Sequence, residues 1–316
     1  MGLEMHLTEI FFEKEERRTD FNPHNIYLPA CGCLDEESVF WVACAERYSG
    51  LRGGIKRRIA VGLQPGKEPI TIELKTKEPQ SIAKEGGRLM VVGNDITEIH
   101  YQDKDKPVVL RNSHPLDIRG VFDEFFGALT PTRTVRCFGI TRLNCMGDIG
   151  NPVYDITESG GKEAIATLNY IKGIVSDRET VYFLHIPVEL SSTHYRTNLY
   201  CLKPSSRDII PVYEWGSPEQ KMISYGALLM DGWDVDGGRL YFLIPANNCF
   251  PMPEPAKKSA IVSAKLDDLR FDYVALEGGL LDKGYCKSLS VRTYGDTTKI
   301  GLVTSAFVGT FELTSH

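Results

Sequence analysis

The chain lacks an excess of basic residues. It has 36 Lys and Arg against 42 Asp and Glu, which gives a formal net charge of −6 at pH 7. Proteins that bind nucleic acid gather Lys and Arg on one face, whereas here the basic residues are scattered apart from the short run Lys56-Arg57-Arg58. This balance argues against a nucleic-acid partner and favours a small or neutral one.

Long hydrophobic runs are also missing. The longest, residues 300–309, already contains Thr304 and Ser305 and is too short to cross a bilayer. The first residues, Met1 to His6, carry neither the basic nor the apolar segment of a secretory or transit peptide, and no Asn-x-Ser/Thr acceptor occurs. We therefore expect a cytoplasmic protein that does not act at a membrane.

Cysteine is used sparingly, and a chain this long can bury a core without disulfides. Several cysteines lie in apolar stretches, where a free thiol packs as a small hydrophobic group. Cys31-Gly-Cys33 has no second Cys or His pair at zinc-finger spacing, so we interpret it as structural. We expect reduced thiols and no metal site from the eight cysteines Cys31, Cys33, Cys44, Cys137, Cys145, Cys201, Cys249 and Cys286.

Motifs for common cofactors are absent. No G-x-G-x-x-G follows a strand and no G-x-x-x-x-G-K-[ST] occurs, so dinucleotide and P-loop sites lack support and we expect no cofactor. Asp103-Lys104-Asp105 and Asp234-Val235-Asp236 have the D-x-D form of metal-dependent sugar-nucleotide transferases. The first lies in a charged loop and the second in a turn, so we expect both to be solvated.

What the sequence does contain is a repeated hairpin pattern. A polar or Gly-rich turn is followed by a β-branched and aromatic run in five places, which is typical of strands. The turns span residues 35–38, 85–88, 177–180, 236–239 and 296–299, and the runs after them begin at Val39, Leu89, Val181, Leu240 and Ile300.

The spacing of the repeat indicates a propeller. From Glu37 to Gly87, Glu179, Gly238 and Thr298 the intervals are 50, 92, 59 and 60 residues, so only the second is stretched. Units that cannot bury their own faces stack around an axis. We therefore predict an all-β fold, with residues 1–316 forming a single five-bladed β-propeller domain. The apolar spacing in Asp117–Leu129 predicts one helix, inserted in a long loop.

The ends of the repeated runs are the candidate site. In a propeller the end of each second strand and the start of each first strand reach the same face, at the mouth of the central channel. Carboxylates and amides, with an arginine, recur seven to nine residues after the turns, a set that suits a polyhydroxylated sugar. They are Glu46, Asp95, Glu189 and Asn247, with Arg47, Asn94 and Asn248 beside them.

Asp95 is the strongest catalytic candidate. The strand-like Val91-Val92 delivers Gly93, Asn94 and Asp95 in turn to the predicted mouth. Gly93 allows close approach of a substrate, Asn94 can bind a hydroxyl, and Asp95 can act as general acid or base.

The second catalytic group is left open by the sequence. Glycosidases use two carboxylates, and Glu46, Asp231 or Glu277 could complete such a pair. A phosphorolytic enzyme needs only one carboxylate, because inorganic phosphate replaces the other, and then cations must hold the phosphate.

The best anion-binding segment is residues 191–198, in which His194, Tyr195 and Arg196 can contact phosphate. Arg142, Lys257 and Lys258 are further cations. The basic stretch Arg52–Arg58 is interpreted as an exposed edge, with ligand contact as the minor alternative.

Asp231-Gly232-Trp233 could add an indole platform for a sugar ring, although a buried Trp is the commoner case. We therefore name Asp231 and Trp233, together with Asn25, Asn94 and Glu46, as candidate substrate-binding residues.

Three short segments carry a family resemblance. Residues 22–29 (NPHNIYLP), 250–258 (FPMPEPAKK) and 276–280 (LEGGL) resemble the relatives of the β-1,2-mannoside phosphorylases in the five-bladed furanosidase-like clan, among them the protozoan mannogen mannosyltransferase/phosphorylases. One departure is that many clan members carry Asp-Pro at the start of the second blade, where this chain has Pro79-Gln80-Ser81.

The resemblance implies a cytosolic, metal-independent and inverting enzyme. Such an enzyme transfers mannose from GDP-mannose onto β-1,2-mannan and also degrades the chain with phosphate to mannose 1-phosphate. By the same likeness, Asp95 is the acid/base, Asn25 and Asn94 line the sugar subsite, and His194, Tyr195 and Arg196 bind phosphate. The partners it implies are a mannose oligosaccharide, phosphate and a sugar nucleotide.

Two other functions stay open. A non-catalytic propeller would bind a glycan or a protein without turnover, since fold does not fix function, and the missing Asp-Pro is consistent with it. An ordinary glycoside hydrolase would release product without phosphate.

Overall fold

The computed structural model describes about twenty segments of the chain, which contain only strands, turns and short connections. No helix occurs in them, and so none that could cross a membrane. They are residues 3–13, 25–48, 54–76, 79, 81–85, 88–93, 96–100, 108–113, 124–129, 135–140, 151–156, 162–168, 171–177, 180–185, 197–202, 209–215, 232–244, 260–267, 271–275 and 286–315.

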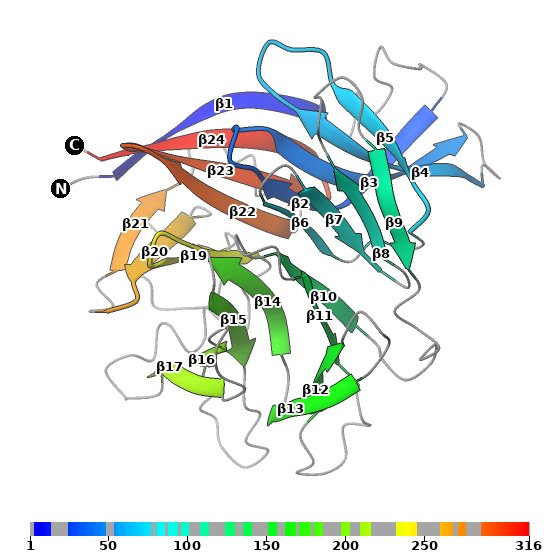
Figure 1. The fold of residues 1–316 in the computed structure, drawn as a ribbon. Helices are drawn as coiled ribbons and strands as arrows, with labels where there is room; N and C mark the ends of the chain where they lie inside the picture. Colours follow the sequence, from blue (N-terminus) through cyan, green and yellow to red (C-terminus); the bar gives the residue numbers. More distant parts are fainter. Residues whose placement is uncertain are drawn as a thin grey trace.

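The described strands form six four-stranded antiparallel sheets (Figure 1). Five are consecutive meanders: β2–β5 (Asn25–Leu34, Phe40–Tyr48, Ile55–Leu63, Ile70–Leu74), β6–β9 (Ser81–Glu85, Arg88–Val92, Ile96–His100, Val108–Ser113), β10–β13 (Glu124–Leu129, Val135–Ile140, Asn151–Ile156, Lys162–Leu168), β14–β17 (Ile171–Asp177, Thr180–His185, Thr197–Leu202, Ile209–Trp215) and β18–β21 (Trp233–Asp236, Arg239–Ile244, Ala260–Lys265, Phe271–Ala275).

The sixth sheet, here called the terminal sheet, joins the two ends of the chain. It contains β22 (Cys286–Tyr294), β23 (Thr297–Thr304), β24 (Phe307–Ser315) and β1 (Leu3–Glu13), in the order β1-β24-β23-β22. Strand β1 pairs antiparallel with β24 along its length, with Leu3 opposite Ser315. The last sheet is therefore completed by the first strand.

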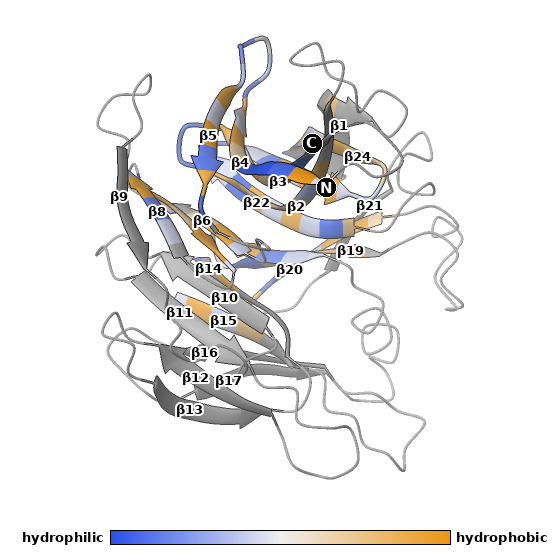
Figure 2. Ribbon diagram, turned by 90° about the vertical axis from the view of Figure 1, so that its right-hand side faces the viewer, coloured by the Kyte–Doolittle hydropathy of each residue, from blue (hydrophilic) through white to orange (hydrophobic). Residues whose placement is uncertain are grey.

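The first strands of neighbouring sheets contact one another. These contacts run in the order β2, β6, β10, β14, β18, β22 and return from β22 to β2. Figure 2, turned by 90°, shows β22 of the terminal sheet beside the β2–β5 sheet, in agreement with the contact between β2 and β22. An all-β fold is confirmed.

The predicted count of five blades is not confirmed, because the described residues form six sheets. The stretched interval between the second and third repeats contains the sheet β10–β13, whose hairpin pairs Leu129 with Val135. The predicted helix at Asp117–Leu129 is wrong over Glu124–Leu129, which is strand β10. A short apolar run does not distinguish a helix from a strand by spacing alone.

Four of the five predicted turns are where the sequence placed them. Asp236 pairs with Arg239, and Gly237 and Gly238 have φ of 58° and 73°, the left-handed conformations that a two-residue type I′ hairpin requires. The fifth is displaced by two residues, since Tyr294 pairs with Thr297 around Gly295.

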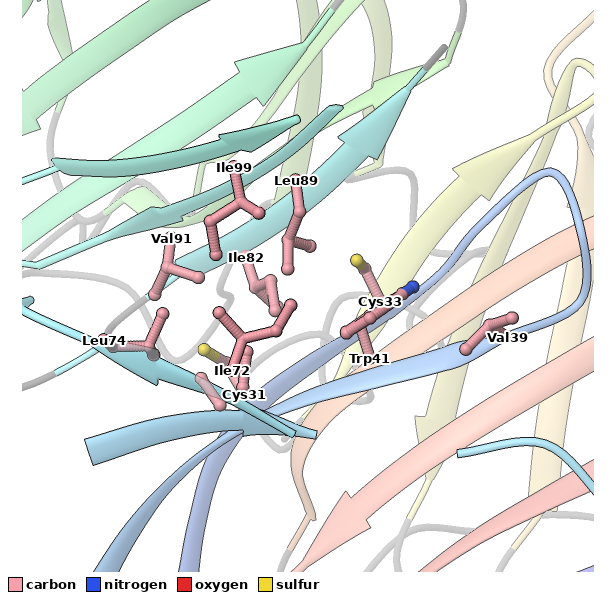
Figure 3. Close-up of a cluster of buried hydrophobic side chains, with 12 residues drawn as sticks. Cys31, Cys33, Val39, Trp41, Ile72, Leu74, Ile82, Leu89, Val91 and Ile99 are labelled. Atoms are coloured by element: carbon pink, nitrogen blue, oxygen red, sulfur yellow. The ribbon is translucent and has the colours of Figure 1, made fainter. Parts of the chain in front are cut away.

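The repeated apolar runs on β3, β7, β19 and β23 are second strands that are buried on both faces, whereas on β15 Val181 and Phe183 are buried and Tyr182 between them is half-buried. Trp41 on β3 belongs to a cluster between the β2–β5 and β6–β9 sheets, drawn in Figure 3 with Ile72, Leu89 and Val91. Phe40 on the same strand packs in a different cluster with Val303 and Val308 of the terminal sheet and others. Successive residues of a strand point to opposite faces, so a strand covered on both faces needs a continuous apolar run.

Side-chain oxygens on first strands fasten neighbouring sheets. On β22 the Ser290 hydroxyl accepts the backbone N–H of Leu34 at 2.9 Å, and on β18 the Asp234 carboxylate accepts that of Val291 at 2.7 Å. Lys287 adds a bond from its ammonium to the carbonyl of Pro29 at 2.8 Å. These bonds hold the first strands in a fixed register.

Gly301→Ala is expected to destabilise the protein by about 1–3 kcal/mol. A Cβ at Gly301 would overlap the ring of Phe40, which is fully buried. Urea unfolding measures the loss. Gly54→Ala is the control, because a Cβ there meets nothing within 4 Å, and equal losses in the two variants would contradict the packing described.

Candidate functional site

The candidate site lies where second strands end and first strands begin. In the β2–β5 sheet, Asn25 at the start of β2 pairs with Tyr48 at the end of β3, and Tyr27 pairs with Glu46. In the β6–β9 sheet, Ser81 at the start of β6 pairs with Val92 at the end of β7. In both sheets the end of the second strand thus lies beside the start of the first strand, as the sequence argument assumes.

Most candidate residues fall outside the described part of the chain. For Asn25 and Arg47 only the backbone is described. The roles of these two residues, and of the candidates outside the described part, stay predictions. Those outside are Asn94, Asp95, Arg142, Glu189, His194, Tyr195, Arg196, Asp231, Asn247, Asn248, Lys257, Lys258 and Glu277.

The strands that flank Asp95 are fixed by buried polar contacts. Val92 ends β7 and pairs with Ile96, which begins β8. Next to them the Thr97 and Thr76 hydroxyls share a hydrogen bond of 2.7 Å, and the Thr76 hydroxyl also lies 3.4 Å from the Val91 carbonyl. Both threonines are fully buried, so the end of β7 is anchored to its neighbours.

Glu46 is a buried carboxylate held by two cations. Its side chain is 1% exposed and forms ion pairs with Arg57 Nε and, at 3.5 Å, with Lys56 Nζ. Burial by itself raises the pKa of Glu46, but the Arg57 hydrogen bond and the charges of Arg57 and Lys56 outweigh it and lower the pKa below 4.5. Glu46 is therefore ionised at neutral pH.

A β-bulge brings both cations to the same carboxylate. Glu46 pairs with Arg57 but the next residue, Arg47, pairs with Ile55, so Lys56 is the extra residue on β4. Consecutive residues of a regular strand point to opposite faces, and a bulge re-aims one of them. The bulge explains how Lys56 and Arg57 both reach Glu46, although residues 54–58 of this basic stretch are exposed or half-buried, as interpreted above.

Trp233 does not offer an open platform. It pairs with Phe242 and is 7% exposed. Burial in the first strand of a sheet covered by its neighbours is the physical reason, and the indole is part of the packing rather than a surface for a sugar ring.

The expectation that Asp234-Val235-Asp236 is solvated holds only in part, because the two half-buried carboxylates also accept backbone hydrogen bonds. Asp234 accepts the backbone N–H of Val291 at 2.7 Å and that of Val235 at 2.9 Å, and Asp236 accepts that of Thr293 at 2.7 Å. The two carboxylates therefore join β18 to β22. Their oxygens bind backbone donors of a neighbouring strand, which the D-x-D pattern alone could not reveal.

The cysteines in the described segments are buried. Cys31 and Cys33 lie in the cluster of Figure 3, as expected of structural residues. Burial raises the pKa of Cys31 to about 12, so this thiol stays protonated. The five described cysteines, all buried, are Cys31, Cys33, Cys44, Cys201 and Cys286.

Comparison with known proteins identifies the fold and no family. No family model and no curated protein sequence matches the chain. Among solved structures it is similar to a luciferin-regenerating enzyme, with 10% identity, a TM-score of 0.56 and coverage of 99% of this chain and 96% of that one. A subtype N11 neuraminidase-like protein of A/flat-faced bat/Peru/033/2010 (H18N11) has 8% identity, a TM-score of 0.47 and coverage of 92% and 88%. The luciferin-regenerating enzyme is a β-propeller, and at this identity the likeness to it shows the fold alone.

Glu46→Gln is expected to lower the unfolding free energy at pH 7 by about 1–3 kcal/mol, because it leaves two cations side by side without their carboxylate. Since the folded pKa of Glu46 is lowered, its contribution is present above pH 4.5 and is lost as the pH falls below that value. Urea unfolding at pH 7 and pH 3 checks both points. Exposed Glu73→Gln is the control, and a loss that persists unchanged at pH 3 would contradict the charge argument.

Stability is expected to fall as the pH rises from about 4 towards about 8. Burial raises the pKa of Asp234 from 3.8 to about 8, against the effect of its two backbone donors. The folded state then binds more protons than the unfolded state in this interval, with a slope of at most about 1.4 kcal/mol per pH unit. Asp234→Asn should flatten the profile in urea unfolding, whereas exposed Asp267→Asn should not. An unchanged slope in Asp234→Asn would refute this assignment.

Proposed function

We propose that the chain is a carbohydrate-active enzyme, a β-1,2-mannosyltransferase/phosphorylase. It acts on β-1,2-mannan oligosaccharides with phosphate or GDP-mannose as the second substrate. The segments 22–29, 250–258 and 276–280 support the substrate class. The count of six sheets differs from the five blades that the resemblance implies, so the proposal depends on residues at the strand ends and not on the fold.

The state of Glu46 is the observation that carries the choice of phosphorolysis over hydrolysis. A hydrolase needs a second carboxyl group beside Asp95. The second group must be an ionised carboxylate that takes a proton from water or attacks the sugar. Glu46 is ionised, but both of its oxygens bind cations, Arg57 and Lys56, which weakens it as a base, and the other two candidates, Asp231 and Glu277, lie outside the described residues. A single acid/base with phosphate as the nucleophile fits this arrangement better.

The proposed reaction needs one proton transfer by the protein. A phosphate oxygen attacks the anomeric carbon from the face opposite the glycosidic oxygen, and the bond from that carbon to the glycosidic oxygen breaks. Asp95 gives its proton to the departing oxygen, which leaves mannose 1-phosphate and a chain shorter by one mannose. In the direction of synthesis the acceptor hydroxyl oxygen attacks the anomeric carbon of GDP-mannose, Asp95 takes the hydroxyl proton, and the bond from that carbon to the phosphate oxygen of GDP breaks, which releases GDP.

The test is incubation with β-1,2-mannobiose, with and without inorganic phosphate. Mannose 1-phosphate should form only with phosphate, and Asp95→Asn should lower the rate by about 10²–10⁴-fold. Asp267→Asn, an exposed Asp elsewhere, is the matched control and should keep full activity.

The alternatives predict other products. Mannose released equally with and without phosphate identifies a hydrolase. Binding of mannobiose without any turnover identifies a glycan-binding propeller, the candidate favoured by Ser81 standing at the start of β6 in place of the clan carboxylate. Full activity in Asp95→Asn would show that another residue is the acid/base.

A further inference from the structure

The contact between β18 and β22, here called the carboxylate seam, is made by titratable side chains. Asp234 and Asp236 on β18 accept the backbone N–H groups of Val291 and Thr293 on β22, each at 2.7 Å. The two aspartates alternate along β18 with buried apolar residues and are themselves half-buried. Because both acceptors are carboxyl groups, the seam responds to the gain and loss of their protons.

The contact between β22 and β2, here called the serine seam, uses neutral acceptors for the same purpose. Ser288 and Ser290 on β22 accept the backbone N–H groups of Gly32 at 3.2 Å and of Leu34 at 2.9 Å. A serine hydroxyl carries no charge in either role, as donor or as acceptor. The two seams therefore share a type of bond and differ in their response to pH.

Two donors reinforce the serine seam. Lys287 donates to the carbonyl of Pro29 at 2.8 Å, and the Tyr294 hydroxyl donates to the carbonyl of Asp35. Lysine and tyrosine ordinarily titrate near pH 10, and burial raises the pKa of Tyr294 further. These bonds are therefore kept while carboxyl groups titrate.

The carboxylate seam gathers like charges when it ionises. Burial raises the pKa of Asp234 to about 8, and its two backbone hydrogen bonds oppose this only in part. Asp236 on its own strand and Asp177 on β14 raise the pKa of Asp234 further. Asp177 is held close, because it accepts the N–H of Gly238 at 3.1 Å. Ionisation of Asp234 thus adds a negative charge beside two other carboxyl groups.

The other charged or titratable groups described around the two aspartates do not change between acidic and neutral pH. They are Arg292 on β22 and Arg239 and Tyr241 on β19. Arginine stays charged in proteins, and burial raises the pKa of Tyr241 above its ordinary 10. Burial also raises the pKa of Asp236, with the charge of Arg292 acting against it. The aspartates therefore carry the pH dependence of the seam.

Tight packing closes the other end of the carboxylate seam. A Cβ at Gly232, the residue before β18, would come within 2.8 Å of the Cys286 sulfur and 2.9 Å of the Leu289 Cβ. Cys286 begins β22. Close contact of this kind does not depend on a charge, so a change of the seam with pH begins at Val291 and Thr293.

We propose that the carboxylate seam is a proton-sensitive device, which opens locally as the pH rises while the serine seam stays closed. An ionised Asp234 is better solvated when β18 separates from β22, because water then reaches the carboxylate. Since its pKa is raised from 3.8 to about 8 in the closed seam, the closed state binds more protons than the open state between these values. The opening constant then rises by at most about tenfold per pH unit.

The device is independent of the reaction proposed above, because none of its residues belongs to the candidate site. Activity on mannobiose therefore neither supports nor contradicts it.

Hydrogen exchange of single amides, followed by NMR and corrected for the intrinsic rate at each pH, tests the device. The protection of Val291 and Thr293 should fall as the pH is raised from about 5 to about 8, by up to about tenfold per unit. At the upper pH both should exchange at least about tenfold faster than global unfolding allows, and low urea should hardly change their rates, because a local opening exposes little surface. Gly32 and Leu34 are the internal control and should show no local opening that grows with pH.

Two matched variants separate charge from hydrogen bonding. Asp234→Asn keeps an oxygen for the Val291 N–H and removes the charge, so Val291 should stay protected at both pH values. Ser290→Ala removes a neutral acceptor and should lower the protection of Leu34 equally at both. Urea unfolding verifies that the variants are folded. Asp177→Asn, which removes only a repelling charge, should weaken the pH dependence and serves if Asp234→Asn does not fold.

Three results would overturn the proposal. They are exchange of Val291 that equals the rate of global unfolding at every pH, a local opening of the serine seam with the same pH dependence, and an unchanged pH dependence in folded Asp234→Asn or, in its place, Asp177→Asn.

Discussion

The arrangement of the sheets depends on hydrogen bonds from the backbone of one first strand to a side chain of the next. Ser290 and Asp234 each accept an N–H from an adjacent sheet. A buried N–H without a partner costs free energy, and the first strand of a sheet has an edge that no strand of its own sheet pairs with. Short polar side chains at these edges both satisfy the backbone and set how neighbouring sheets align.

The same chemical group serves two purposes in this molecule, according to its partners. At Asp234 desolvation outweighs the neutral backbone donors and favours the protonated carboxyl, whereas at Glu46 two cations favour the carboxylate. The arrangement at Asp234 is suited to joining neighbouring strands. The arrangement at Glu46 places charge at the strand ends, where the candidate ligands are expected to bind.

Sequence reasoning recovered the parts of the structure that rest on local pattern. The runs beginning at Val39, Leu89 and Leu240 are strands, because strands buried on both faces need continuous apolar residues. Strand β10 (Glu124–Leu129), the first of the sheet β10–β13, was not predicted, because its short apolar run also fits helical spacing. Contacts between distant residues, such as Asp234 with Val291, could not be read from composition, and neither could the bulge that turns Lys56 towards Glu46.

The pairing of β1 with β24 has a consequence for synthesis on the ribosome. Strand β1 cannot pair with β24 until β24 has left the exit tunnel, so the terminal sheet forms only after the strands of the other five sheets have been made. Until then the apolar face of β3 that Val303 and Val308 cover is exposed to other chains. The nascent protein therefore passes through a stage at which a chaperone has a surface to bind.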